Sequence, residues 1–476
     1  MLMTPILGYE PRPGRLVEWT LDERTLAAAE VAPAHPSPPS YVQERHIRRA
    51  LANEESGTVQ SPWLATVFDL PGRLDTAAMG AAIEKWIRRH PTLLTWFGVE
   101  GDDLRRHAVP ADTLSLHTTE IGEFSEAAAI REYLLDRFDV ETNPLRWPPF
   151  VFGTILREDS STVYFAVDHS HSDGYSIILV FDELRTLYQA ELDGTEAELP
   201  EVGSYVDFCR LERERAARIT ANSPAVHRWL EFWLAGGGQP PRFPLDLGVT
   251  ANGSYPAVPF EIDLFDAAEA DTFATACKDL GGGFSAGLLA AIGITNRELA
   301  GQDDYRGLAV VHTRDEPRWA ATQGWFINLV PVRFPVSGRF DEVIGQAQSA
   351  FSAARELAGV SVHRVAEVVS EGLNTGADPR AVLPMVSYID TRVAPGSRDF
   401  EQADCRVLGG PGDSHDVPIW VNRLWGRTYL KASYPDTPRA RANVPRYLEH
   451  LREVLRAVVR TGGYRVGELE PTAAGG

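Results

Sequence analysis

Cysteine and long apolar runs are scarce in this chain of 476 residues, and each scarcity excludes a class of protein. The three cysteines lie far apart and form no Cys-x-x-Cys pair, so neither a disulfide framework nor a thiolate zinc site is indicated. We expect Cys209, Cys277 and Cys405 to be small buried apolar residues. No apolar stretch approaches the ~18–20 residues of a membrane-spanning helix, and the first residues lack the pattern of a secretory signal. The sequence therefore predicts a cytoplasmic protein without a membrane span.

Positive charge is also in short supply. The chain has 46 Lys and Arg residues against 66 Asp and Glu residues, which gives a formal net charge of −20 at pH 7. Binding to nucleic acid or to an anionic membrane needs concentrated positive charge, so neither is expected as a partner. Lysine occurs only at Lys85, Lys278 and Lys431, so nearly all of the cationic side chains are arginines.

The length and the apolar content are sufficient for two packed cores. Hydrophobic residues make up 44% of the chain, which fits two domains or one large unit with two lobes. Helix-like and strand-like segments are mixed, and strands are often adjacent in sequence, which favours an α+β layered fold over a doubly wound parallel sheet. We place the lobe boundary near residue 195, so the predicted lobes are residues 1–195 and 196–476. A monomer is expected.

The most informative stretch is a strand-to-helix corner near the middle of the first lobe. Residues 162–167 alternate β-branched and aromatic side chains and predict a strand. The polar sequence DHSHSDG at 168–174 follows, and apolar residues then recur at helical spacing at Ile177, Phe181 and Leu184. A side chain at such a corner can project into a cleft. The neutral imidazole of His169, with an ordinary pKa of ~6.5, is suited to accept a proton from a hydroxyl or an amine.

Helix ends are predicted from capping residues elsewhere in the chain. Asp75 is expected to cap the helix that carries Trp86 on its apolar face. Asn443 is expected to cap the last helix, with Pro445 in its first turn and Gly462 just past its end.

Five segments, in this order, resemble motifs of one protein family. They are 41–45 (YVQER), 89–97 (RHPTLLTWF), 169–174 (HSHSDG), 205–208 (YVDF) and 324–333 (GWFINLVPVR). The third is similar to the second half of the HHxxxDG motif of the condensation-domain and chloramphenicol-acetyltransferase-like acyltransferases. The last segment, together with 387–390 (SYID) and 433–436 (SYPD), looks most like the free-standing polyketide-associated acyltransferases of the Pap type.

This resemblance implies two chloramphenicol-acetyltransferase-like lobes in a V-shaped pseudo-dimer, with a central substrate tunnel. It implies that His169 deprotonates an alcohol or amine acceptor, which then attacks an acyl thioester. Asp173 carries over as the structural partner of an arginine in the second lobe, for which Arg314 is the best match. Gly174 lets the backbone turn close to the site. The resemblance implies no cofactor, because acyl-coenzyme A or a phosphopantetheinyl carrier protein acting in trans is a donor substrate.

The chain departs from the motif at its first position. The family has histidine there, whereas this chain has Asp168. A carboxylate beside His169 is expected to raise the pKa of that histidine. The group that stabilises the oxyanion is not assigned, and Trp325, Asn328 and Ser387 are candidates for it by position. Together with Asp168 they are candidates for substrate contact.

Two other chemistries are suggested by parts of the sequence. His169 and His171 could be metal ligands, but no third ligand accompanies them at a recognised spacing, so no metal is expected. The sequence GFSAG at 283–287 fits the GxSxG nucleophile elbow of the α/β-hydrolases, in which Ser285 would be the nucleophile. That elbow requires a preceding strand, whereas residues 274–282 are polar and helix-like. Ser285 is therefore expected to be the N-cap of a helix over 286–299.

A third alternative is a non-catalytic relative that binds a carrier protein or a thioester without turnover, and Asp168 in place of histidine gives it some basis. The sequence predicts instead a free-standing acyltransferase that joins an acyl thioester to a hydroxyl or amine in natural-product or lipid biosynthesis. It does not determine the acyl chain, the acceptor or the type of donor.

Overall fold

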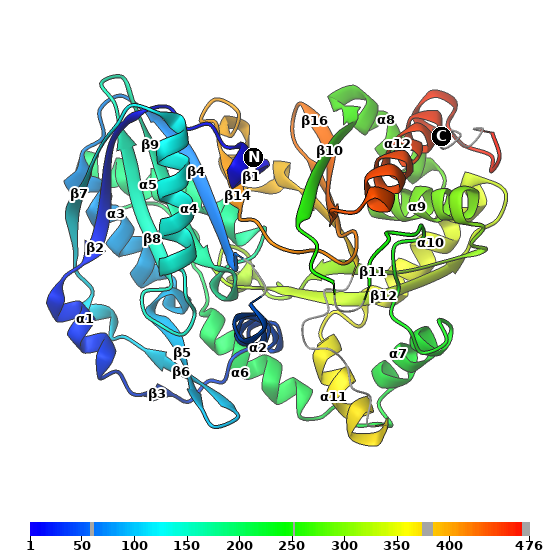
Figure 1. Ribbon diagram of the computed structural model, residues 1–476, viewed down its shortest axis with the longest axis horizontal. Helices are drawn as coiled ribbons and strands as arrows, with labels where there is room; N and C mark the ends of the chain where they lie inside the picture. Colours follow the sequence, from blue (N-terminus) through cyan, green and yellow to red (C-terminus); the bar gives the residue numbers. More distant parts are fainter. Residues whose placement is uncertain (58–60, 251–252, 374–383, 469–476) are drawn as a thin grey trace. The chain divides into compact units, whose positions relative to one another are not determined.

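The computed structural model describes residues 1–57, 61–250, 253–373 and 384–468 (Figure 1). The chain forms two compact units. The first consists of Met1–Ala217, Arg314–Phe326 and Val393–Pro411, and the second of Arg218–Thr313, Ile327–Arg392 and Gly412–Gly476. The first unit thus extends past the boundary expected near residue 195, and two later segments of the chain belong to it.

The first unit is built around a seven-stranded sheet. Its strand order is β1 (Leu2–Pro5), β14 (Arg406–Gly409), β4 (Trp63–Pro71), β9 (Ser160–Asp168), β8 (Phe150–Leu156), β2 (Gly14–Leu21) and β7 (Leu116–Phe124). All neighbours are antiparallel except β1 and β14. The predicted strand at 162–167 is confirmed as β9, which lies at the centre of the sheet.

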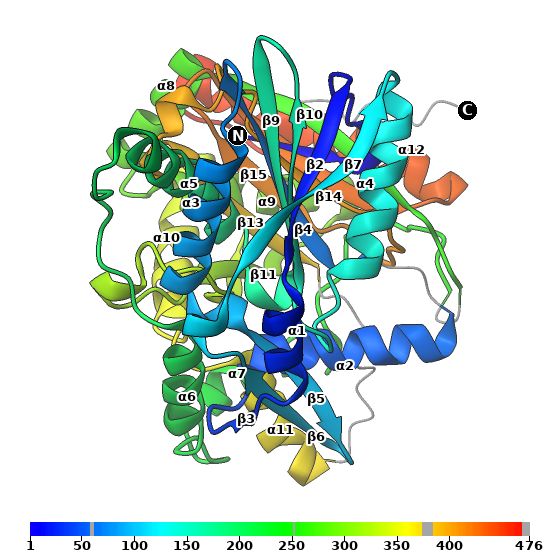
Figure 2. The same ribbon diagram turned by 90° about the vertical axis from the view of Figure 1, so that its left-hand side faces the viewer.

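Helices cover both faces of this sheet (Figure 2). On one face α4 (Ala127–Glu141) packs Ile130, Leu134 and Phe138 against the strands. On the other face lie α3 (Thr76–Arg89) and α5 (Ser176–Asp193), where Trp86 meets an aromatic ring of β9, Phe165, edge to face. Every residue of β9 is buried, as expected for a strand that is covered on both sides. The predicted cap is confirmed, since Asp75 accepts the N–H groups of Ala77 and Ala78.

The remaining elements of the first unit lie around this sheet. A three-stranded sheet has the order β3 (Ala34–His35), β6 (Asp103–Ala108) and β5 (Thr95–Glu100). The helices are α1 (Glu23–Glu30), α2 (Tyr41–Ser56) and α6 (Tyr205–Ala216). Helix α2 begins with a capping box in which Ser40 and Gln43 bond each other's backbone N–H groups. The 3₁₀ turns are η1 (Ile6–Gly8), η2 (Pro91–Leu94), η3 (Ala111–Thr113), η4 (His169–His171), η5 (Pro317–Trp319) and η7 (Ser397–Asp399).

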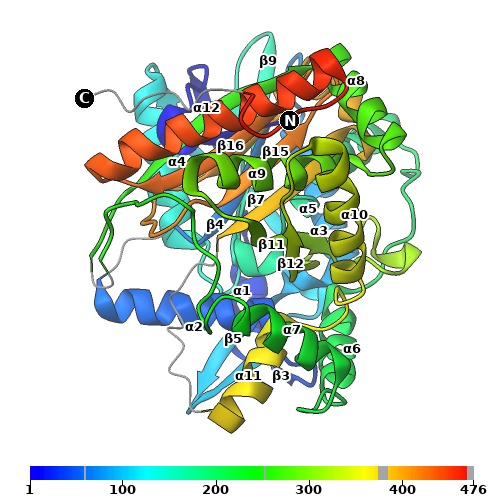
Figure 3. The same ribbon diagram turned by 90° about the vertical axis from the view of Figure 1, so that its right-hand side faces the viewer.

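The second unit contains a six-stranded mixed sheet. Its order is β10 (Ala257–Asp266), β16 (Arg427–Pro435), β15 (Ile419–Arg423), β13 (Met385–Asp390), β11 (Asp304–His312) and β12 (Ile327–Pro335). The helices are α7 (Pro224–Leu234), α8 (Ala267–Asp279), α9 (Phe284–Ala300), α10 (Phe340–Arg355), α11 (Val362–Leu373) and α12 (Pro438–Thr461), and η6 (Thr391–Val393) follows β13 (Figure 3). One continuous apolar core joins these helices to the sheet.

Two helix starts differ from the sequence predictions. Helix α9 begins after Gly283, so Ser285 lies inside its first turn and is not the N-cap. Helix α12 begins after Thr437, whose side chain accepts the N–H of Ala440, so the predicted cap at Asn443 is wrong. Pro445 lies inside that helix, which ends as predicted at Gly462. None of the helices in the described ranges has the length and apolar character to cross a bilayer.

Gly324 provides a test of packing in the first unit. Its φ is +156°, and a Cβ there would lie 2.3 Å from the ring of Tyr205. We predict that Gly324→Ala lowers the free energy of unfolding by about 1–3 kcal/mol, because both the backbone and the ring must move. Denaturant unfolding measures the loss. Gly345→Ala is the control, since its Cβ meets nothing within 4 Å inside α10 and should raise the stability by ~0.5–1 kcal/mol. Equal effects of the two substitutions would contradict the packing at Gly324.

Candidate active site

His169 stands at the corner between the central strand and a helix of the first unit. Strand β9 ends at Asp168, His169 begins the single turn η4 (His169–His171), and α5 starts at Ser176. The backbone N–H of His169 donates to the carbonyl of Pro62 at 2.9 Å, which fixes the corner to the start of β4. This placement agrees with the strand-to-helix corner that the sequence predicts.

The imidazole of His169 is packed on one side and partly exposed. Its ring lies on the indole of Trp325, with 4.0 Å between the ring centroids and 32° between the planes. Nδ1 is buried and has no hydrogen-bond partner on any other described residue. The residue as a whole is partly exposed, and Nε2 is not among the buried polar atoms that lack a partner.

The surroundings of His169 disfavour its protonated form. Burial and, next, the nearby His46 lower the pKa of His169 to about 4, and the opposing charges of Asp168 and Asp173 do not compensate. Asp168 does act to raise this pKa, as expected, but burial and His46 outweigh it. At neutral pH the imidazole is uncharged and has a free lone pair.

Asp168 is hydrogen-bonded by a residue that the sequence analysis did not single out. Oδ2 of Asp168 accepts a hydrogen bond from Nε2 of His46 on α2 at 3.1 Å, and both side chains are almost completely buried. Oδ1 accepts the N–H of Ser170 at 2.8 Å and so caps η4. Burial raises the pKa of Asp168, but His46, His171 and Ser170 more than offset this and lower the pKa below its ordinary value. The observed contacts of Asp168 are with the protein itself, and its predicted role in substrate contact stays a prediction.

Helix α2 holds the turn at a second point. The side-chain amide of Gln43 donates to the carbonyl of Ser170 at 2.7 Å. Next to it, Nε2 of His171 lies 3.0 Å from the carbonyl of Thr95 and Nδ1 lies 2.8 Å from Oγ of Ser170. The carbonyl requires a donor, so the proton of His171 is on Nε2, and both ring nitrogens are occupied. The described residues contain no group of three potential His, Cys, Asp or Glu metal ligands.

Asp173 is the most heavily bonded carboxylate at the corner. Oδ1 accepts the N–H groups of Tyr175 and Ser176 at 3.0 and 2.6 Å, and Oδ2 accepts the N–H of Phe326 at 2.8 Å. The guanidinium of Arg314 pairs with Oδ1 at 3.4 Å, and both side chains are buried. The structure thus brings together Asp173 and Arg314, within the first unit. Gly174 lies in the turn that joins Asp173 to α5 and is partly exposed.

The arginine is itself anchored on the segment that carries Trp325. Arg314 donates to the carbonyl oxygens of Trp319 and Thr322 at 2.5 and 2.8 Å and to Oγ of Ser176 at 2.7 Å. The carbonyl of Trp325 accepts the hydroxyl of Tyr205 at 2.9 Å. The backbone of Trp325 is therefore fixed by Tyr205, and the residues before it in the chain are fixed by Arg314.

The other two predicted contact residues belong to the second unit. Asn328 lies in β12, where its amide nitrogen donates to the carbonyl oxygens of Leu357, Ala358 and Val360. Ser387 is buried in β13. Their predicted contact with substrate stays a prediction.

The Ser285 alternative has no structural support. Helix α8 precedes α9, whereas a nucleophile elbow requires a strand at that position. Gly287 has a packing explanation instead, since a Cβ there would lie 2.3 Å from Sγ of Cys277 on α8. All three cysteines are buried, as predicted, and none is in a disulfide.

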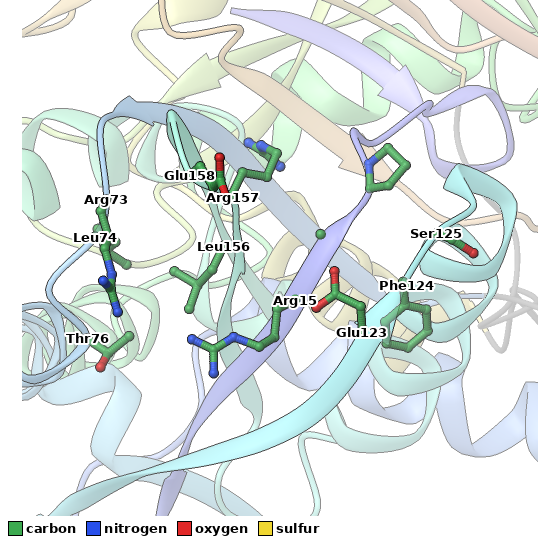
Figure 4. Close-up of a pocket in the computed structure, with 12 residues that line it drawn as sticks. Arg15, Arg73, Leu74, Thr76, Glu123, Phe124, Ser125, Leu156, Arg157 and Glu158 are labelled. Carbon is green, nitrogen blue, oxygen red and sulfur yellow. The ribbon is translucent and has the colours of Figure 1, made fainter.

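A surface cavity of the first unit lies away from the corner. It has a volume of about 610 Å³ and a lining that includes Arg15, Arg73, Leu156 and Glu158 (Figure 4). These residues lie near Ser160, where β9 begins, whereas His169 follows the other end of that strand. A strand of this length separates the two by roughly 25 Å, so the cavity takes no part in chemistry at His169.

The pair of His46 and Asp168 can be tested by substitution. We predict that His46→Leu lowers the free energy of unfolding by about 3–5 kcal/mol, because Oδ2 of the buried carboxylate of Asp168 loses its donor. His46→Gln keeps a donating N–H within reach and should lose clearly less. Denaturant unfolding at pH 7 compares the two variants. Equal losses would show that the volume of His46, and not its hydrogen bond, stabilises the corner.

Comparison with known proteins identifies the family of the chain. Residues 40–470 match the family model of the condensation domain. PapA1 of Mycobacterium tuberculosis, a 2'-acyl-2-O-sulfo-trehalose (hydroxy)phthioceranyltransferase, is 33% identical, and the match covers 99% of this chain and 92% of PapA1. PapA2 of the same species, a trehalose-2-sulfate acyltransferase, is 31% identical, with 98% and 99% covered.

A solved structure of a PapA2 acyl transferase matches with a TM-score of 0.89 at 29% identity and covers 96% of this chain and 100% of that chain. The predicted α+β class with two chloramphenicol-acetyltransferase-like lobes is thereby confirmed. Since the family model spans most of the sequence and the relatives match over nearly their whole length, this chain belongs to the condensation-domain family and is an acyltransferase.

Proposed function

We propose that the chain transfers an acyl group from a thioester to a hydroxyl of a carbohydrate acceptor, with His169 as the general base. The observation that carries this proposal is the state of His169: its imidazole is neutral, partly exposed, and packed on Trp325 at 4.0 Å. A neutral base held in one orientation can accept a proton without first losing one.

The reaction requires only groups of the substrates and one imidazole. Nε2 of His169 takes the proton of the acceptor hydroxyl as its oxygen attacks the thioester carbonyl carbon. The tetrahedral intermediate then collapses, the C–S bond breaks, and the leaving thiolate takes the proton back from the imidazolium. The products are an ester and a free thiol, and the enzyme carries no acyl group at any stage.

Asp173 has a positioning role in this proposal. Its oxygens are occupied by three backbone N–H groups and by Arg314, so it holds the corner and does not touch substrate. Trp325 limits the rotation of the imidazole. The low pKa of His169 makes it a weak base, so the rate must come mainly from orientation of the reacting groups.

The names of the relatives support the choice of acceptor. PapA1 and PapA2 are named for the acylation of sulfated trehalose, so a hydroxyl of a disaccharide is the acceptor that we propose here. An amine remains the alternative nucleophile. The donor would be acyl-coenzyme A or an acylated carrier protein in trans, in lipid assembly in the cytoplasm.

The role of His169 can be measured directly. We predict that His169→Ala lowers acyl transfer at pH 7 by roughly 10²–10⁴-fold, because the hydroxyl loses its proton acceptor. Product formation from octanoyl-coenzyme A and trehalose or trehalose 2-sulfate is followed by mass spectrometry. Ser285→Ala, in the second unit, is the control and should match the native chain. Equal turnover in native and His169→Ala proteins would remove His169 as the base, while thioester binding without turnover in either would favour a non-catalytic binding module.

The pH dependence follows from the lowered pKa of His169. Protonation removes the base, so activity is present above the pKa and is lost as pH falls through about 4. We predict that the acid limb of kcat/KM lies near pH 4 and not near the ordinary ~6.5. A limb near 6.5 with the fold intact would contradict the lowered pKa.

Stability must be followed in the same experiment. The pKa of His171 is also lowered to about 4 by burial, so the unfolded chain binds more protons than the folded chain between pH ~6.5 and ~4. The free energy of unfolding therefore falls as pH falls through this window. Circular dichroism at each pH separates loss of the base from loss of the fold.

A further inference from the structure

Helix α2 carries an arginine one turn beyond His46, the residue that donates to Asp168. Arg49 follows His46 by three positions, so the two side chains lie on the same face of the helix. That face is the one turned toward the corner, since the ring of His46 contacts Asp168 and lies with its centroid 6.1 Å from that of His169. Arg49 therefore lies on the face of α2 that is turned toward the corner, and the carboxylate of Asp168 acts on its charge.

Arg48 and Arg49 of α2 differ in their hydrogen-bond partners. Arg48 faces outward and is engaged by Glu44 at 2.7 Å and by the carbonyl of Asp102 at 2.8 Å. Arg49, by contrast, makes no hydrogen bond or ion pair with any residue in the described ranges. A guanidinium with five N–H donors and no acceptor is uncommon unless solvent or a ligand supplies one.

The electrostatic surroundings of Arg49 also indicate that its guanidinium needs an acceptor from solvent or a ligand. Burial and then the charge of Arg45 lower the pKa of Arg49 to about 10, with Asp168 acting in the opposite direction. The guanidinium remains charged at neutral pH, in surroundings that disfavour charge. Asp168 does not bond to it; the hydrogen bonds of its carboxylate oxygens come from His46 and Ser170.

We propose that Arg49 binds an anionic ester group of a substrate, a sulfate or a phosphate, and so orients that substrate beside His169. The proposal rests on the proposed acyl transfer. It adds that either the acyl donor or the acceptor carries a sulfate or phosphate group. A guanidinium matches the oxygens of a sulfate or phosphate ester in a bidentate manner.

Two sources of that anion are consistent with the chemistry. The first is a sulfated sugar acceptor, since two relatives are named for sulfated trehalose. The second is the phosphate of coenzyme A or of a phosphopantetheinyl arm on the donor. In both cases the affinity for the uncharged counterpart of the same substrate should not depend on Arg49.

The test compares charged and uncharged probes with the full chain. Isothermal titration calorimetry measures the affinity for trehalose 2-sulfate against trehalose, and for octanoyl-coenzyme A against octanoyl-N-acetylcysteamine. The proteins are the native chain, Arg49→Gln, Arg49→Lys and the matched control Arg48→Gln, all checked by circular dichroism. Because Arg49 has no partner to lose within the described residues, its variants should fold.

We expect Arg49→Gln to weaken binding of one charged probe by roughly tenfold to hundredfold and to leave both uncharged probes unchanged. Arg49→Lys should recover part of the affinity, and Arg48→Gln should resemble the native chain. The probe that is affected identifies the acceptor or the donor as the source of the anion. Unchanged affinity for both charged probes in Arg49→Gln would overturn the proposal.

This test does not depend on turnover. His169→Ala should bind both charged probes as the native chain does, because it retains Arg49. If His169→Ala keeps full acyl transfer, the base is wrong, yet the binding arms still decide the role of Arg49. If Arg49→Gln binds normally while His169→Ala is inactive, the proposed function stands without this anion site.

Discussion

The carboxylate of Asp173 accepts hydrogen bonds from two distant parts of the chain. The turn between β9 and α5, which carries His169, depends on these bonds. The carboxylate takes N–H groups from the start of α5 and, through Phe326, from a residue 153 positions later. A buried carboxylate is stable only when it is paired and fully hydrogen-bonded, and Arg314 supplies the opposite charge. That bond fixes Phe326, and Trp325 before it supplies the ring on which His169 packs. The orientation of the base thus depends on a carboxylate that does not touch substrate.

The replacement of histidine by Asp168 at the first motif position has a physical counterpart on α2. A carboxylate at the end of a completely buried strand requires a donor, and His46 provides one at 3.1 Å. The carboxylate is on the turn, and the ring that donates to it is on the helix. Because that ring also lies near His169, it adds to burial in lowering the pKa of His169. The charge of Asp168 acts to raise this pKa, and burial together with His46 outweighs it.

The sequence predicts what depends on local pattern and misses what depends on distant contacts. The strand at 162–167, the helix that follows it and the cap at Asp75 follow from periodicity and capping chemistry. Strand β14 was missed because it is a short segment that pairs with β4, more than 300 residues earlier, and no local signal specifies that pairing. His46 was missed for the same reason, although it directly follows the motif at 41–45. The cap at Asn443 was wrong because Pro445 was assigned to a first turn, whereas α12 accommodates it further inside.

The charge of the whole chain explains why recognition of an anionic substrate would have to be local. A net charge of −20 repels an anion at long range, but at physiological salt the field of exposed charges is screened beyond ~8 Å. A side chain in contact with the anion is screened much less, so one guanidinium beside the base outweighs many distant carboxylates. Arginine suits this task better than lysine, because its fork binds two oxygens and so fixes orientation as well as charge. In a chain whose cations are nearly all arginines, the one on α2 that lacks a protein partner within the described residues is the group best placed for that contact.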